Sequence, residues 1–347
     1  MTLKDLVRPN IWNLSPYTCA RNEFTGEALA WLDANENSRI CQYNRYPDPL
    51  QMEVKQQLGA YHGVNPENIF LGVGSDECID IAYRVFCRPG IDNVVAIEPT
   101  YGMYQVCADV NDVEYRRVSL NDDFSLDVDA IINACDEKTK IVWICSPNNP
   151  TANAFPLEQI KEICSRFNGI TIVDEAYIDF SPVGSMVQFL NDYPRMIVMQ
   201  TFSKAWASAA IRLGISYASD EIINIYNKVK YPYNISELTQ QEALKVLADS
   251  AHIEAIVKEL IDARNALAEK LSTLPDVKYI YPSDANFLLV KVSDADAIYN
   301  YLRDEKVIVR NRTRVHKCGE CLRLTIGNDA ENALLIEKLT EYGNTRK

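Results

Sequence analysis

Short apolar runs alternate with amphipathic stretches in the middle of the chain. Four runs have the length and character of buried strands, at 94–97, 141–144, 170–173 and 196–199. Between the second and the third run, apolar side chains recur at the three- and four-residue spacing of a helix, at Leu157, Ile160, Ile163, Cys164 and Phe167. Strands that alternate with helices form right-handed βαβ units, so the pattern predicts an α/β fold around a mostly parallel sheet.

The pattern changes near residue 236. The apolar spacing over 253–271 predicts a long helix, which Leu274-Pro275 ends. Shorter elements follow, with strands predicted at 286–292, 307–309 and 322–326 and helices at 294–304 and 329–342. Few periodic signals occur before residue 45. We therefore expect three parts, namely an N-terminal arm (1–45), a large α/β domain (46–235) and a small C-terminal α+β domain (236–347).

The charge of the chain narrows the range of partners. The 347 residues include 48 acidic and 35 basic side chains, which gives a formal net charge of −13. Nucleic acids and anionic membranes favour a positive protein surface, so we expect neither as a partner. A small anionic substrate is compatible with this charge, because a few arginines in a cleft outweigh it locally.

No segment predicts export or membrane insertion. The first ten residues carry acidic and basic side chains without an apolar core, and no apolar run reaches the roughly 18 residues of a transmembrane helix. The ten cysteines are scattered, and several stand inside apolar segments. We therefore expect a reduced, cytoplasmic protein.

Polar residues follow directly after three of the apolar runs. Ser-Pro-Asn-Asn-Pro-Thr occupies 146–151, Asp-Glu-Ala-Tyr occupies 174–177, and Thr-Phe-Ser-Lys occupies 201–204, with Arg212 eight residues after the lysine. A further segment, Gly-Ser-Asp-Glu at 74–77, opens a predicted helix. Ligands in open α/β sheets bind at the carboxyl ends of the strands, so these segments are the candidates for chemistry. Each of them alone is also typical of an ordinary turn, a helix cap or a surface lysine.

The order of these segments, together with Pro-Thr-Tyr at 99–101, resembles fold-type I pyridoxal 5′-phosphate (PLP) enzymes of the aminotransferase class I and II group. The resemblance covers roughly residues 30–330. It implies that PLP is the cofactor and that the amine of Lys204 holds it covalently and later moves a substrate proton. It also implies that the carboxylate of Asp174 keeps the ring nitrogen of PLP protonated, with Tyr177 at the same site.

The remaining cofactor contacts follow from the same resemblance. Asn149 and Tyr177 bind the ring hydroxyl oxygen, and Tyr101 covers one face of the ring. The cofactor phosphate needs N–H groups at a helix start, hydroxyls and an arginine. The residues that the resemblance assigns to the phosphate are Ser75, Asp76, Thr201, Ser203 and Arg212.

Position 152 departs from the pattern of the group. The residue after Asn-Pro-Thr is usually glycine there, and this chain has Ala152. Alanine adopts a positive φ poorly. We therefore expect an ordinary backbone conformation at Ala152 or a slightly displaced loop, which bears on the placement of Asn149.

Segments outside the cofactor motifs resemble the histidinol-phosphate aminotransferase family. They lie at 7–11, 15–17, 32–37 and 44–49 near the N-terminus, and at 309–312 and 321–327 near the C-terminus. In that family, L-histidinol phosphate and 2-oxoglutarate give imidazole-acetol phosphate and L-glutamate, a step of histidine biosynthesis. The resemblance implies the same activity for this chain.

The same family resemblance implies the substrate contacts. Arg310 and Arg323 bind the substrate anions, because a guanidinium fork matches both phosphate and carboxylate. Tyr17 and Asn35 of the arm close over the substrate. Tyr46 reaches the cofactor phosphate of a neighbouring subunit, so a homodimer is expected. Arg312 is interpreted instead as a solvated residue of a hairpin.

Several other functions fit parts of the sequence. An aromatic aminotransferase or a threonine-phosphate decarboxylase would share the cofactor residues and differ only in the substrate pocket. A non-enzymatic PLP-binding regulator usually carries a fused DNA-binding domain, for which a 45-residue arm is too short. A catalytically inactive scaffold is disfavoured because every polar group that the chemistry requires is present.

Three weaker motifs point elsewhere. His316, Cys318 and Cys321 fall one ligand short of a structural zinc site, and the cysteine pair precedes a predicted strand, so we expect no metal. The glycines at 72 and 74 lack the third glycine of a dinucleotide-binding loop. The acidic pair 174–175 resembles the end of an ATPase strand, but no G-x-x-x-x-G-K-[ST] sequence accompanies it.

Overall fold

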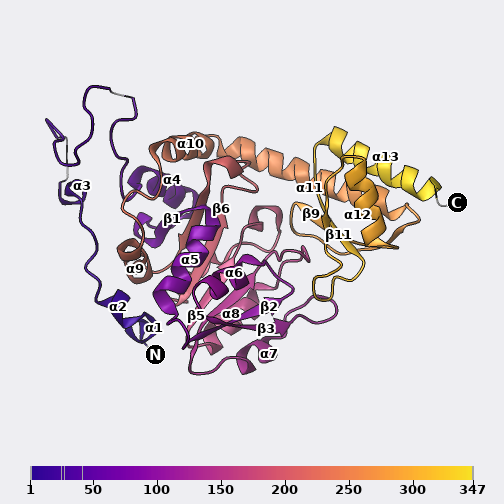
Figure 1. Cartoon of the computed structure of the whole chain (residues 1–347), viewed down its shortest axis with the longest axis horizontal. Coiled ribbons are helices and arrows are strands. Elements are labelled where there is room, and N and C mark those ends of the chain that lie inside the picture. The colour runs from indigo at the N-terminus through magenta and orange to yellow at the C-terminus, as the bar shows by residue number, and fades with distance from the viewer. Residues whose placement is uncertain (1, 25, 27, 41, 346–347) are drawn as a thin grey trace.

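The computed structural model describes residues 2–24, 26, 28–40 and 42–345. Figure 1 shows a body built around a large central sheet, a smaller layer of strands and helices beside it at the C-terminal end, and an N-terminal arm that leaves the body on the opposite side. A long helix, α11 (Ser250–Ser272), leads from the body to the smaller part. No described helix combines the length and the apolar character needed to cross a membrane.

The large sheet has seven strands in the order β1-β7-β6-β5-β4-β2-β3. Strands β3, β2, β4, β5 and β6 run parallel, and β7 runs antiparallel to its neighbours β6 and β1. The predicted α/β fold with a mostly parallel sheet is therefore confirmed. The bounds of the strands are β1 (Ile69–Val73), β2 (Asn93–Glu98), β3 (Glu114–Ser119), β4 (Thr139–Cys145), β5 (Ile170–Asp174), β6 (Met196–Thr201) and β7 (Leu213–Tyr217).

Both faces of this sheet are covered, which explains why its central strands are apolar throughout. Successive side chains of β4 point to opposite faces, so Ile141 and Trp143 pack in one cluster and Val142 and Ile144 in the other. The first cluster also contains side chains of α5 (Gly74–Phe86), α6 (Met103–Val110) and α9 (Asp220–Val229). The second contains side chains of α4 (Met52–His62), α7 (Val128–Asn133), α8 (Leu157–Arg166) and α10 (Glu237–Ala248).

Two strands of the large sheet have no apolar run that could predict them. β3 is an edge strand whose charged residues Glu114, Arg116 and Arg117 are only partly buried or exposed. β7 is short and contains Gly214, where the backbone passes close to the start of α5. A Cβ atom at this glycine would collide with the backbone nitrogen of Ser75, so no larger residue fits.

The C-terminal part contains a four-stranded antiparallel sheet in the order β10-β11-β9-β8. Its elements are β8 (Val277–Ile280), β9 (Phe287–Val292), α12 (Ala295–Asp304), β10 (Arg310–Asn311), β11 (Cys321–Thr325) and α13 (Asp329–Thr345). The strand predicted at 307–309 is wrong, because only Arg310 and Asn311 pair with β11 and Val309 packs into the apolar cluster without a strand partner. The domain boundary at residue 236 stays a prediction.

The arm begins attached to the body and then separates from it. Leu6 and Val7 are buried against α5, and the backbone N–H of Arg8 donates to the carbonyl of Val85. Beyond α2 (Pro9–Trp12) the chain projects away from the central sheet (Figure 1). It also contains the short helices α1 (Leu3–Leu6) and α3 (Ala20–Glu23), so the predicted irregular segment has some local structure.

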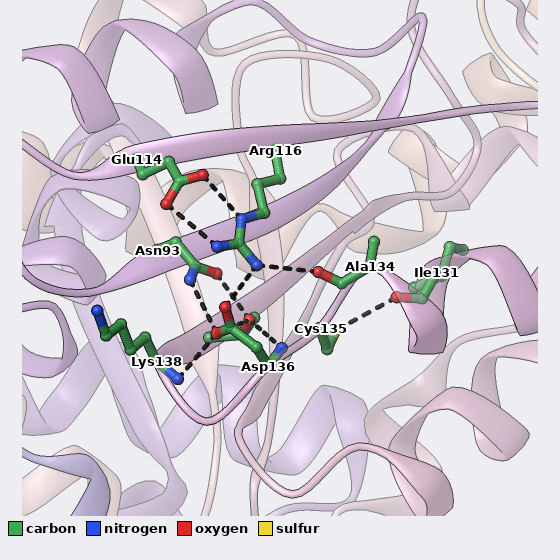
Figure 2. A network of polar contacts seen from close by, with 9 residues as sticks. Asn93, Glu114, Arg116, Ile131, Ala134, Cys135, Asp136 and Lys138 are labelled. Carbon is green, nitrogen blue, oxygen red and sulfur yellow. Dashed lines mark hydrogen bonds and ion pairs between the residues drawn. The ribbon is translucent and has the colours of Figure 1, made fainter.

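A polar network joins the amino ends of the neighbouring strands β3, β2 and β4 (Figure 2). It lies at the edge of the sheet opposite to the carboxyl ends, which the polar motifs follow. The carboxylate of Asp136 accepts hydrogen bonds from the side chain of Asn93 at 3.0 Å and from the backbone N–H of Lys138 at 2.8 Å. It also forms an ion pair with Arg116 of β3 at 2.8 Å. These contacts, chiefly the hydrogen bond from Asn93, hold the pKa of Asp136 well below its ordinary value although burial opposes them.

Replacing Asp136 with asparagine is expected to lower the free energy of unfolding by about 1 kcal/mol near pH 7, because Arg116 loses one of its two charged partners and keeps only Glu114. The loss is kept small by solvent screening, since the Asp136 side chain is 41% exposed. A depressed pKa stabilises the fold above the unfolded-state value and loses this effect as the pH falls. Urea unfolding should therefore show a constant deficit at neutral pH that shrinks below about pH 4.

Asp304→Asn is the matched control for this experiment. The carboxylate of Asp304 meets Arg303 on the surface, with 70% of its side chain exposed. This variant should change the free energy of unfolding by less than about 0.5 kcal/mol. Equal effects of the two substitutions would contradict a stabilising role of the Asp136 network.

Candidate active site

A cavity of about 620 Å³ opens at the carboxyl ends of the parallel strands. Cys145 at the end of β4, Asp174 at the end of β5 and Thr201 at the end of β6 contribute to its wall. Arg310 of β10 and Arg323 of β11 complete it from the smaller sheet. The cavity therefore lies where ligands bind in open α/β sheets, closed on one side by the C-terminal part.

Twelve of the residues predicted for the site line this single cavity. They come from segments spread over about 250 positions of the chain, and they are Ser75, Asp76, Tyr101, Asn149, Asp174, Tyr177, Thr201, Ser203, Lys204, Arg212, Arg310 and Arg323. Tyr17, Asn35 and Tyr46 do not line it. Tyr17 and Asn35 belong to the arm, where Tyr17 is 74% exposed, and Tyr46, directly after the arm, stacks on Tyr233 at 4.4 Å.

The carboxylate of Asp174 lies at the bottom of the cavity and is 3% exposed. The hydroxyl of Tyr104 donates to Oδ2 at 2.5 Å, and the backbone N–H of Ala176 donates to Oδ1 at 3.1 Å. Burial raises the pKa of Asp174, while these hydrogen bonds and the charge of Lys204 oppose the rise. Such a carboxylate can stabilise a cationic N–H group that binds beside it in the cavity.

Lys204 stands in the loop after β6, and its side chain is exposed to the cavity. Its Nζ lies 5.7 Å from the centre of the Tyr177 ring. The surrounding walls lower the pKa of the amine by desolvation, and the charge of Arg323 adds to this effect. A lowered pKa increases the fraction of neutral amine, which is the nucleophilic form.

Asn149, Tyr177 and Arg323 form a connected group on one wall. Arg323 Nη1 donates to Asn149 Oδ1 at 2.6 Å, and Asn149 Nδ2 donates to the Tyr177 hydroxyl at 3.5 Å. The guanidinium of Arg323 also lies over the ring of Phe287, 5.2 Å from its centre. The smaller sheet is thus tied directly to a polar group of the large sheet inside the cavity.

The start of α5 forms a second polar corner with the turn that precedes β7. Gly74 has φ +68°, a backbone conformation that favours glycine, and a Cβ atom there would displace the guanidinium of Arg212. Arg212 pairs with Asp76 at 3.4 Å, and the hydroxyl of Thr201 lies 3.0 Å from that of Ser203. Helix N–H groups, hydroxyls and an arginine together suit a phosphate group.

Three arginines of the C-terminal part, Arg310, Arg312 and Arg323, line the cavity. Arg312 lines the cavity beside Arg310 and Arg323, so its interpretation as a solvated hairpin residue is wrong. Burial, together with the positive charges of Arg323 and Arg310, lowers the pKa of Arg312 to about 10. Within the described residues, none of the three forms an ion pair with a carboxylate, so the group is suited to bind an anion from outside.

Tyr104 belongs to the site although no feature of the sequence indicates it. It follows Tyr101 by three residues on α6, and the motif around Tyr101 assigns it no role. Its partner Asp174 lies 70 positions away. Only the packing of α6 on the end of β5 brings the two together.

The backbone of Ala152 contradicts the expectation of an ordinary conformation. Its φ is +72°, in the left-handed region. The N–H of Ala152 donates to the carbonyl of Asn148 at 2.8 Å, and the carbonyl of Ala152 accepts from the N–H of Asp284 at 2.8 Å. The surrounding hydrogen bonds therefore hold a conformation that costs alanine roughly 1–2 kcal/mol.

The residues of the weaker cysteine motif lie away from the cavity. The side chain of His316 is 2.9 Å from the hydroxyl of Ser119, while Cys318 and Cys321 are buried among apolar side chains. Throughout the described parts of the chain, no three or more His, Cys, Asp or Glu residues are grouped as metal ligands.

Comparison with known proteins gives matches over nearly the full length. The aminotransferase class I and II family matches residues 12–339. A histidinol-phosphate aminotransferase of Bacteroides fragilis is 53% identical over 342 residues, which cover 98% of this chain and 99% of the relative. One of Parabacteroides distasonis is 52% identical over 337 residues, covering 97% and 98%.

A solved structure supports the same fold. The crystal structure of histidinol-phosphate aminotransferase from Sinorhizobium meliloti in complex with pyridoxal-5′-phosphate superposes with a TM-score of 0.80. The two chains are 22% identical, and the match covers 87% of this chain and 84% of the other. At this identity the likeness concerns the fold.

Replacing Ala152 with glycine is expected to change the free energy of unfolding by less than about 1 kcal/mol, because relief of the left-handed backbone offsets the lost methyl group and the greater entropy of the unfolded chain. Ala243 is the control, since it is also fully buried but lies inside α10. Ala243→Gly should destabilise by about 2 kcal/mol in urea unfolding. Equal losses at the two positions would contradict the strain at Ala152.

Proposed function

Because the chain belongs to the aminotransferase class I and II family, we propose that it is a PLP-dependent enzyme that transfers the amino group of L-histidinol phosphate to 2-oxoglutarate. The products are imidazole-acetol phosphate and L-glutamate, and the step belongs to histidine biosynthesis. The observation that carries the proposal is the sequence identity of about one half with relatives of that name. This identity extends through nearly the whole chain. It therefore includes the arm and the arginine-containing segments that we assign to substrate binding.

The residues of the cavity fit PLP as the cofactor. When bound, PLP draws electrons away from the carbon that bears the substrate amino group and so lets that carbon lose a proton. The amine of Lys204 is suited to hold the cofactor and to move this proton, since its pKa is lowered. Asp174 is suited to hold the ring nitrogen in its protonated form, and Asn149 and Tyr177 to bind the ring hydroxyl oxygen.

The polar corner at the start of α5 suits the cofactor phosphate. In this assignment the N–H groups at Ser75 and Asp76, the hydroxyls of Thr201 and Ser203 and the guanidinium of Arg212 surround the phosphate. Tyr101 also lines the cavity, with its hydroxyl 3.4 Å from Asp76, and in this assignment it would cover one face of the ring. The side chains thus separate the cofactor phosphate from the substrate anions, which meet a different set of arginines.

Arg310, Arg312 and Arg323 suit the two unlike anions that the site receives in turn. Histidinol phosphate brings a phosphate monoester, and glutamate brings two carboxylates. A guanidinium binds either group through two parallel hydrogen bonds. Because the three arginines have no described carboxylate partner, the incoming substrate supplies the compensating charge.

We further propose that the enzyme is a cytoplasmic homodimer in which the arm covers a neighbouring subunit. The arm exposes large apolar side chains, with Leu29 fully exposed and Leu32 92% exposed. Several large apolar side chains exposed on one projecting segment favour burial against a second copy. Tyr17 and Asn35 would then close over the partner's substrate, and Tyr46 would reach the partner's cofactor phosphate.

The activity is tested by assaying the purified protein with histidinol phosphate, phenylalanine and phosphothreonine. We expect a clear preference for histidinol phosphate with 2-oxoglutarate as acceptor. Lys204→Ala should abolish turnover and remove the long-wavelength absorption that PLP shows when it is joined to a protein amine. A preference for either other substrate, or a band that persists in the variant, would contradict the proposal.

Arg312→Gln is expected to raise the KM for histidinol phosphate by about tenfold, because a charge-assisted hydrogen bond to the phosphate is lost. kcat should stay within about twofold if the interaction is equal in the ground and transition states. Arg314→Gln serves as the control, since Arg314 is exposed on the same turn and does not line the cavity. Steady-state kinetics in which both variants match the wild type would exclude Arg312 from substrate binding.

A further inference from the structure

Tyr104 is a buried polar side chain without a role among the proposed cofactor and substrate contacts. Its side chain is fully buried, and its hydroxyl lies 2.5 Å from Oδ2 of Asp174. Burial raises the pKa of Tyr104 well above its ordinary value, and the charge of Asp174 raises it further. The phenol therefore keeps its proton and acts as a hydrogen-bond donor to the carboxylate.

The orientation of the Asp174 carboxylate is fixed by donors on both oxygens. Tyr104 donates to Oδ2, and the backbone N–H of Ala176 donates to Oδ1 at 3.1 Å. Two donors on different oxygens set the plane of the carboxylate. Each oxygen accepts two hydrogen bonds in its ionised form, so acceptor capacity remains for a group in the cavity.

The Tyr104 hydroxyl has little freedom to leave this position. The ring of Tyr104 stacks on Trp143, with centres 4.6 Å apart and an interplanar angle of 11°. Tyr101 meets the Tyr104 ring edge-on at 5.7 Å. Tyr83 also stacks on Trp143, at 5.6 Å, and its hydroxyl donates to the backbone carbonyl of Tyr104 at 2.7 Å. Stacking of the rings from α5 and β4 thus holds the ring of Tyr104 in place.

We propose that Tyr104 is a positioning residue that orients the carboxylate of Asp174 and keeps it ionised for the ring nitrogen of PLP. This inference rests on the proposed function, because it concerns the same cofactor site. The hydroxyl acts through Asp174 and does not itself touch the cofactor.

The charges around Asp174 explain why a dedicated donor is needed. Burial favours the neutral acid, and the carboxylate of Asp76 adds to that tendency. The Tyr104 hydroxyl is the first of the groups that oppose it, followed by the Ala176 N–H and the charge of Lys204. Once the amine of Lys204 is joined to the cofactor, it is no longer a free ammonium group that stabilises the carboxylate of Asp174. The Tyr104 hydroxyl then supplies a larger share of that stabilisation.

The test compares the binding of PLP with that of an analogue in which a C–H group replaces the ring nitrogen. Quenching of tryptophan fluorescence in the cofactor-free protein gives both dissociation constants. The ratio of the two constants isolates the contribution of the ring nitrogen from every other contact. Tyr104→Phe is expected to reduce the preference for PLP by about tenfold, because a hydrogen bond to a charged group is lost.

Tyr83→Phe is the matched control. It removes a buried hydroxyl from the same aromatic stack, but this hydroxyl donates to a backbone carbonyl and not to Asp174. Its preference for PLP should stay within about twofold of the wild type. In an Asp174→Asn background, Tyr104→Phe should no longer alter the preference, because the charge through which it acts is absent.

If Tyr104→Phe disturbs the aromatic stack, a fluorinated tyrosine at position 104 provides a second test that preserves the stack. It retains the shape of the side chain and donates more strongly, so it should raise the preference for PLP above the wild-type value. An unchanged preference in Tyr104→Phe, or an equal loss in Tyr83→Phe, would overturn the role of Tyr104 alone. A wild-type protein that binds neither PLP nor the analogue would overturn the proposed function itself.

Discussion

The burial of one carboxylate, that of Asp174, is the constraint on which the rest of the site depends. A charge removed from water is costly unless it is paired and hydrogen-bonded. Here the end of β5 places the carboxylate at the bottom of the cavity, and the surrounding elements supply the Tyr104 hydroxyl, the Ala176 N–H and the Lys204 amine. The cofactor ring would complete this compensation.

The same cavity contains a buried carboxylate and a group of positively charged arginines. Its wall contains buried Asp174 from the large sheet and Arg310, Arg312 and Arg323 from the C-terminal part. The overall charge of −13 gives no hint of this local positive region. A cationic ring nitrogen at one end and an anionic substrate group at the other would satisfy both, and would orient the substrate relative to Lys204.

Much of the fold could be predicted because the signals are local. Continuous apolar runs correspond to buried parallel strands, and the motifs follow those strands at their carboxyl ends. β3 and β7 escaped prediction since an edge strand with charged residues and a short strand containing Gly214 have no such run. The strand predicted at 307–309 failed because apolar residues alone do not provide a pairing partner.

The site was predictable where the residues stand in motifs, and not where tertiary packing creates the contact. Tyr104 meets Asp174 only after α6 has packed on the sheet, and Arg312 enters the cavity only after β10 has paired with β11. Ala152 shows the reverse effect, because hydrogen bonds to Asn148 and Asp284 override its backbone preference. Such interactions depend on distant segments, which propensity and spacing do not report.

The protonation state of the ring nitrogen tests the central claim most directly. Nitrogen NMR of the protein loaded with PLP labelled with ¹⁵N in the ring distinguishes a protonated from an unprotonated nitrogen. An ionised Asp174 beside the ring nitrogen predicts that this nitrogen stays protonated throughout the neutral pH range. An unprotonated ring nitrogen in the loaded protein at neutral pH would contradict the account.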